Sequence, residues 1–186
     1  MHLVVLSTKT PLLDAVLPQF KAQDVRLSTL DPQDVQVNDT WIKSTLQEIA
    51  EQQGEIDGFL YLAGSSEEPA LMPFLFAKHL SRHFHRSDHP SRKAFVIAIS
   101  LDGCFGLNTA QDFQPETGAL AGLVKTLHQE WPWVFTRIID FAPQLEPETV
   151  ASQIVAEWTD ADRRWVEIGI TSEVRQTVEF IELPPR

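Results

Sequence analysis

Cysteine is nearly absent from this chain of 186 residues, which contains only Cys104. Disulfide frameworks and thiolate zinc sites both need several cysteines, so the sequence excludes both. Basic residues are also scarce, with 15 Lys and Arg against 26 Asp and Glu and a net charge of -11 at pH 7. Such a charge repels nucleic-acid phosphates and anionic lipid headgroups. We therefore expect neither a nucleic acid nor a membrane surface as a partner.

Long apolar runs are missing too, since none approaches the ~20 residues that span a bilayer. The apolar start, residues 1–6, lacks the basic region and the cleavage site of a signal peptide. Hydrophobic residues make up 43% and charged residues 22% of the chain, which suits a folded domain with a complete core. We expect one soluble, cytoplasmic domain over residues 1–183, with residues 184–186 as the start of a tail or linker.

Short apolar runs alternate with longer helical patterns. We expect strands at residues 2–6, 25–30, 58–63, 93–100, 135–141 and 165–170, and one more over 177–183. We expect helices at residues 10–23, 41–53, 70–84, 118–130 and 147–158. Apolar strands that are each followed by a helix are typical of a parallel sheet buried on both faces. The pattern predicts a Rossmann-like, doubly wound α/β fold with three α/β/α layers.

Glycine is absent before Gly54. A fold that binds a dinucleotide usually has glycines just after its first strand, where the backbone approaches the pyrophosphate at the next helix N-terminus. Here the first strand is followed by residues 7–11 (STKTP), whose side chains would occupy that space. Pro11 also lacks an amide donor, and Lys9 is interpreted as a solvated loop residue. We therefore expect this chain to bind no cofactor.

Several stretches resemble the short-chain dehydrogenase superfamily. Residues 57–64 (DGFLYLAG) resemble its fourth strand and the following turn, and residues 94–100 resemble the strand that ends in its catalytic serine. Residues 118–132 (GALAGLVKTLHQEWP) resemble its long active-site helix. From residue 118 to 169 the chain is most similar to ketoreductase regions of polyketide synthases and polyunsaturated fatty acid synthases. In those regions, the resemblance implies, a reduced non-catalytic Rossmann half precedes a catalytic half that binds NADPH.

The resemblance also locates degenerate catalytic positions. Ser100 falls where the family has its serine, and Phe113 and Thr117 fall where it has its tyrosine and lysine. Phenylalanine has no hydroxyl to protonate an alkoxide, and threonine cannot hold a nicotinamide ribose as lysine does. Tyr61, the only tyrosine, lies within an expected buried strand. We therefore predict no catalytic residue, and interpret Ser100 as a strand-end residue that satisfies loop amides.

The helix expected over residues 118–130 has more apolar surface than one sheet-facing stripe needs. Pro115 disfavours the start of a regular helix between Phe113 and Thr117. We predict that the helix contributes a contact surface for another Rossmann-like half, through Ala119, Leu120, Ala121, Gly122, Leu123 and Leu127. The alternative is that the helix only lies on its own sheet, with small residues for close packing.

Other polar residues are given no chemical role. Two histidines four residues apart on a helix are able to share a metal, but a site also needs a third ligand and an orienting shell. We expect no metal site at His79, His83, His85 and His89, because neighbouring Arg and Lys residues disfavour a cation, and interpret the segment as a basic, solvated helix end and loop. Asp140, Glu167 and residues 67–68 are interpreted as surface charges, and Cys104 as a thiol without a base.

The favoured hypothesis is a non-catalytic structural subdomain of a ketoreductase in a polyketide or polyunsaturated fatty acid synthase. It would support a catalytic half, in the same polypeptide, that uses NADPH to reduce a β-ketoacyl chain. Self-association of this chain is a further option. Two alternatives remain. One is a free-standing NAD(P)-dependent short-chain reductase with an atypical active site that uses Ser100. The other is a pseudoenzyme that binds a different small ligand. The acyl substrate is left open.

Overall fold

The computed structural model describes residues 1–34, 38–63, 70–84, 93–107 and 115–179. In these residues a seven-stranded sheet has the order β2-β1-β3-β4-β5-β6-β7. The strands are β1 (His2–Leu6), β2 (Arg26–Leu30), β3 (Gly58–Leu62), β4 (Ala94–Ser100), β5 (Phe135–Phe141), β6 (Glu167–Ile170) and β7 (Arg175–Gln176). All neighbours pair in parallel except β6 and β7.

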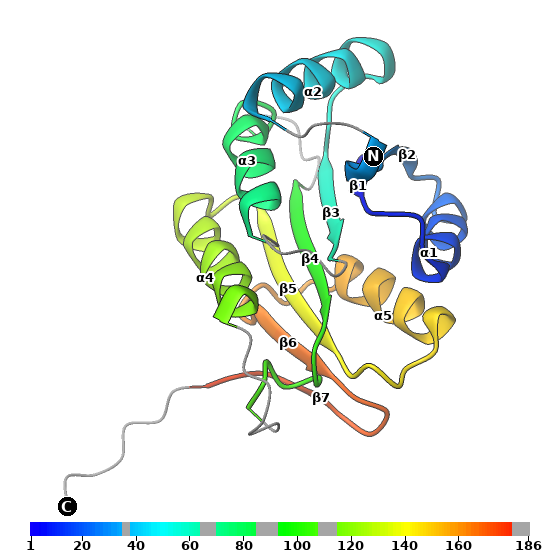
Figure 1. Ribbon diagram of the computed structural model, residues 1–186, viewed down its shortest axis with the longest axis vertical. Helices are drawn as coiled ribbons and strands as arrows, with labels where there is room; N and C mark the ends of the chain where they lie inside the picture. Colours follow the sequence, from blue (N-terminus) through cyan, green and yellow to red (C-terminus); the bar gives the residue numbers. More distant parts are fainter. Residues whose placement is uncertain (35–37, 64–69, 85–92, 108–114, 180–186) are drawn as a thin grey trace, which may run out of the picture.

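Helices cover both faces of this sheet. They are α1 (Pro11–Lys21), α2 (Asp39–Gln53), α3 (Leu71–Leu80), α4 (Pro115–Glu130) and α5 (Pro147–Thr159), and a 3₁₀ turn lies at Pro32–Asp34. Figure 1 shows α1 and α5 on one face and α2, α3 and α4 on the other. Two hydrophobic clusters correspond to these two faces. The predicted three-layer Rossmann-like fold is confirmed.

Helix ends follow the local sequence. The Asn38 side chain accepts a hydrogen bond from the Trp41 amide at 2.9 Å and caps α2. Gly54, with a φ of 89°, ends the same helix. Pro115 is the first residue of α4, so the expectation that it disfavours a helical start is wrong. The first helical position tolerates proline because its missing amide would have no partner there.

The C-terminal strand differs from the prediction. It is the two-residue β7 at Arg175–Gln176, and residues 177–179 form no strand. The Thr171 hydroxyl accepts hydrogen bonds from the amides of Glu173 and Val174 and turns the chain early, so β7 returns antiparallel to β6. The expected domain boundary at residue 183 lies outside the described residues. None of the helices in the described ranges is long and apolar enough to cross a membrane.

Candidate functional site

The turn after β1 lies at the carboxyl edge of the sheet, where open α/β sheets bind their ligands. The Thr10 hydroxyl accepts a hydrogen bond from the Leu13 amide at 3.2 Å, and Pro11 has no amide to offer. Ser7 is buried, but Lys9 and Pro11 are exposed, so only part of this segment fills the space beyond the strand as predicted. The turn fits a dinucleotide pyrophosphate poorly, because the Leu13 amide is already bound by Thr10 and Pro11 has no amide.

A small hollow lies beside this turn, at the carboxyl ends of β3, β4 and β5. Its volume is about 140 Å³. Apart from Ser100 its lining is apolar and includes Leu12, Ala98, Phe141, Pro147 and Val150. Sites for small molecules and cofactors usually enclose roughly 300–1,000 Å³. The hollow is smaller than this range and has room for one small apolar group.

The predicted degenerate triad is only partly described. Ser100 ends β4, is exposed, and borders this hollow. Phe113 lies outside the described residues. Thr117 lies in the first turns of α4, and its side chain is not among those described. The assignment of Phe113 and Thr117 to the family's tyrosine and lysine positions therefore stays a prediction.

The sequence analysis did not recognise that Asp140 is a buried residue that holds the loop after β4. It is completely buried at the end of β5, so its interpretation as a surface charge is wrong. Its Oδ1 accepts from the Leu101 amide at 2.8 Å, and its Oδ2 accepts from the Phe105 amide at 2.7 Å. Among the described residues, the Leu101 and Phe105 amides are thus bound by Asp140 and not by Ser100, which ends β4 as expected. An acidic residue inside the otherwise apolar run IIDF was the available signal.

The second carboxylate considered, Glu167, is mostly buried. Its Oε1 lies 3.1 Å from Lys125 Nζ of α4, so it is an ion-paired strand residue and the surface-charge interpretation is wrong. Cys104 lies in the turn after β4, and its thiol pKa is raised by burial and by the carboxylates of Asp102 and Asp140. A raised pKa makes the thiol a poorer nucleophile at neutral pH. Residues 67–68 lie outside the described residues.

Fewer residues of α4 are accessible to a partner than the sequence predicted. Leu120, Ala121 and Leu127 are buried in the core of this same chain, so they are not available to a partner. Ala119 is exposed and Gly122 and Leu123 are half-buried. A methyl group added at Gly118 or Gly122 would have no atom within 4 Å. On the neighbouring helix α3, Leu71 and Phe74 are about half exposed, at 49% and 52%.

The histidines do not form a metal centre among the described residues. His79 is buried, and its Nε2 lies 3.0 Å from Asp39 Oδ1, which also contacts Lys78 Nζ at 2.7 Å. These hydrogen bonds lower the pKa of Asp39. The interpretation of this segment as solvated is therefore wrong for His79, which links α3 to α2. His85 and His89 lie outside the described residues.

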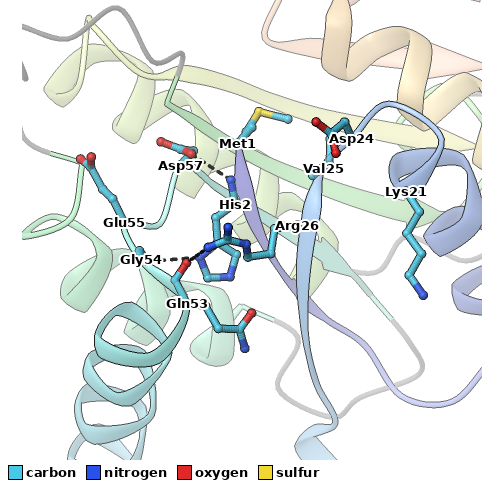
Figure 2. A pocket seen from close by; sticks show the side chains of 10 residues that line it. All are labelled: Met1, His2, Lys21, Asp24, Val25, Arg26, Gln53, Gly54, Glu55 and Asp57. Atoms are coloured by element: carbon cyan, nitrogen blue, oxygen red, sulfur yellow. Dashed lines mark hydrogen bonds between the residues drawn. The ribbon is translucent and has the colours of Figure 1, made fainter.

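A wider hollow of about 570 Å³ lies at the opposite, amino edge of the sheet (Figure 2). Several of its polar groups are bound within the protein. His2 Nε2 lies 2.9 Å from Ser28 Oγ, and the His2 amide donates to Asp57 Oδ2 at 2.8 Å. Figure 2 also shows the Arg26 guanidinium against the Gln53 carbonyl, to which it donates. These groups stabilise the strand starts, and the hollow lies away from the carboxyl edge.

Comparison with known proteins agrees with this fold. No protein-family model matches the sequence. One component of the polyunsaturated fatty acid synthase of Thraustochytrium sp. is 32% identical over 154 residues, which cover 77% of this chain but only 5% of that protein. A short-chain dehydrogenase from Mycobacterium avium has a TM-score of 0.69 and 13% identity, and covers 98% of this chain and 87% of its own.

Two further solved structures contain ketoreductases. A multidomain structure of a keto acid-selecting module with adenylation, ketoreductase and pseudo-Asub domains has a TM-score of 0.72 and 14% identity, over 94% of this chain and 16% of its own. A C2-type ketoreductase from a modular polyketide synthase has a TM-score of 0.63 and 12% identity, over 99% of this chain and 42% of its own. The predicted fold is thus confirmed: the chain has the fold of these short-chain dehydrogenase and ketoreductase structures, and most of it is similar in sequence to a small part of that synthase component.

Proposed function

We propose that this chain is a non-catalytic structural subdomain of a ketoreductase in a polyketide or polyunsaturated fatty acid synthase. In this proposal it supports a second half that binds NADPH and reduces a β-ketoacyl chain. The observation that carries the proposal is the turn after β1. There the Thr10 hydroxyl takes the Leu13 amide and Pro11 supplies none, at the place where the fold would otherwise hold a pyrophosphate.

The lengths of the similar proteins support a role as part of a larger polypeptide. The chain spans about 5% of the curated relative's length. It also covers 42% of the modular ketoreductase chain while almost all of its own residues are matched, which leaves more than half of that protein for further structure. A partner half within the same polypeptide is consistent with both proportions.

The outer surfaces of α3 and α4 are our proposed site for that half. Both helices cover the same face of the sheet (Figure 1). Phe74 and Leu71 supply half-exposed apolar side chains on α3. Ala119 and Gly122 have little or no side chain on the outer surface of α4, so a second backbone is able to come close to this helix. Leu120, Ala121 and Leu127 are not part of this surface, because they belong to the chain's own core.

The first test is cofactor binding. We expect isothermal titration of this chain with NADPH, and with NADH, to give no saturable heat up to millimolar nucleotide, because Thr10 binds the Leu13 amide, Pro11 has no amide, and the hollow is small. Co-expression with the adjoining reductase half is expected to restore binding on that half. Micromolar binding by the chain alone would contradict the proposal and favour the free-standing reductase.

The second test concerns the docking surface. Ala119→Arg places a long charged side chain on the exposed side of α4, and we expect it to weaken association with the co-expressed catalytic half at least tenfold while leaving the fold intact. Pull-down yield and circular dichroism provide the two readouts. The matched control is Ala156→Arg at an exposed position of α5, on the other face of the sheet, which should leave association unchanged. Equal effects of the two variants would place the contact elsewhere.

A further inference from the structure

The two edges of the sheet are built differently. At one end β7 has only the two residues Arg175–Gln176, and so short a strand offers little to another strand. At the other end β2 has five residues and pairs with β1 on one side only, in a register without a bulge. It contains neither proline nor lysine, two residues that often protect an edge strand from pairing. β2 is therefore the edge at which a further strand is able to pair.

The backbone groups of β2 alternate between its two sides. The Arg26 amide donates at 3.0 Å to the carbonyl that precedes β1. Bonding residues alternate along a parallel ladder, so Arg26, Ser28 and Leu30 face β1. Leu27 and Thr29 lie between them and direct their amides and carbonyls away from the sheet. Within the described part of the chain, no group binds these outward amides and carbonyls. They are left to water or to another strand.

The side chains of β2 also suit a neighbouring strand. Thr29 is exposed, and Leu27 is half-buried beside the core that faces α1 and α5. Leu30 is half-buried beside the core of the opposite face. The charge of Arg26 is turned toward α2, because its guanidinium donates to the Gln53 carbonyl (Figure 2). A further strand would therefore cover apolar side chains without meeting a charge that projects from the edge.

The sequence of β2 is complementary to itself when two copies run antiparallel. Only the outward residues form hydrogen bonds in such a pair, so Leu27 would exchange two hydrogen bonds with Thr29 of the second copy, and Thr29 with its Leu27. Ser28 would lie on the twofold axis, opposite Ser28 of the second copy. Arg26 would lie opposite Leu30 of the second copy, so no like charges oppose one another. One patch thus serves both copies, as a twofold dimer requires.

We propose that this chain forms a weak homodimer in which β2 pairs antiparallel with β2 of a second copy and the two sheets become continuous. A second copy is the occupant because an identical strand, centred on Ser28, satisfies all the outward groups of Leu27 and Thr29. The contact is separate from the outer surfaces of α3 and α4, so it stands whether or not the docking surface there is correct. Each copy has a net charge of -11, and this repulsion keeps the association weak.

Sedimentation equilibrium of the unmodified chain tests the dimer. Over about 5 to 500 µM, the range in which small interfaces associate, the average mass should rise from 21.0 kDa toward twice that value. Raising the salt from about 0.05 to 0.5 M should move this rise to lower protein concentration, because salt screens the repulsion between the copies. A mass that stays at 21.0 kDa throughout would overturn the proposal and leave the edge to a strand of another polypeptide.

Amide hydrogen exchange followed by NMR locates the contact. The protection of the Leu27 and Thr29 amides should rise roughly fivefold or more from the lowest to the highest of these concentrations, because only the dimer gives these amides an acceptor. The Ser28 amide faces β1 in both states, so its protection should not depend on concentration. Association that leaves the Leu27 and Thr29 amides unprotected would place the contact elsewhere and would also overturn the proposal.

Variants of Thr29 separate pairing from folding. Thr29→Pro removes an outward amide and puts a ring where the second strand would lie, while the ladder to β1 does not use that amide. We expect this variant to keep its circular dichroism spectrum and to remain at the mass of one chain. The matched control is Thr29→Val, which keeps the amide and the branched shape and should associate like the unmodified chain.

Thr29→Lys is a second variant that leaves the backbone of β2 unchanged. It brings two positive charges close together across the twofold axis, and lysine is a residue that keeps edge strands apart. We expect it to weaken association roughly tenfold or more relative to Thr29→Val. If Thr29→Lys associates as tightly as Thr29→Val, the β2 edge is not the contact and the proposal is overturned, whatever the effect of proline on the strand.

Discussion

Replacing Arg137 with alanine is expected to lower the free energy of unfolding by about 3–5 kcal/mol, the usual cost of breaking a buried ion pair by removing one partner. Arg137 is completely buried in β5. Its guanidinium lies 2.5 Å from Glu157 Oε2 and 2.9 Å from Asp160 Oδ2. Urea denaturation followed by circular dichroism measures the loss, and the midpoint should fall without a change in slope.

The size of this effect follows from what Arg137 leaves behind. Its guanidinium also donates to the carbonyls of Asp162 and Trp165, and it lies over the Phe135 ring at 4.6 Å. Alanine would leave a cavity, unpaired carbonyls and the buried Glu157, which keeps only Arg175. The matched control is Arg164→Ala, because Arg164 is 77% exposed and its pair with Asp162 is open to water. Equal losses in both variants would show that Arg137 is not a centre of stability.

Trp158→Ala should also cost about 3–5 kcal/mol, because it empties the space of a large buried aromatic side chain. Trp158 is 2% exposed and meets the Phe20 ring of α1 edge-on, with centroids 5.5 Å apart. Its ring fills a notch at Gly58, where an added methyl group would lie 2.4 Å from it. One side chain thus joins α5, α1 and β3, and its loss should lower the thermal midpoint as well.

Trp133→Ala is the control for this variant. Trp133 is 40% exposed, and its indole N–H donates to the Phe84 carbonyl, so its removal opens little internal space. We expect a loss well below that of Trp158→Ala in the same urea titration. A loss of similar size would mean that the contact between α1 and α5 contributes less to stability than its burial indicates.

The amino-acid sequence by itself determined the layers and most elements of this fold. Uninterrupted apolar runs such as residues 3–6 and 94–99 bury both strand faces, so they are recognisable wherever their partners lie. Asn38 and Gly54 mark helix ends through local chemistry, and the proline-containing turn at Thr10–Pro11 is equally local. The glycine-free turn was therefore predictable, and the absence of cofactor binding stays a prediction.

Only the tertiary structure decided which polar residues are structural. Whether Asp140 is buried depends on a turn 35 residues away whose Phe105 amide it binds, and His79 depends likewise on Asp39. The same holds for α4: its apolar residues divide between Leu120, which faces the sheet, and Ala119, which faces outward. Periodicity gives the stripes of a helix or strand, but the neighbours that cover each stripe come from distant parts of the chain.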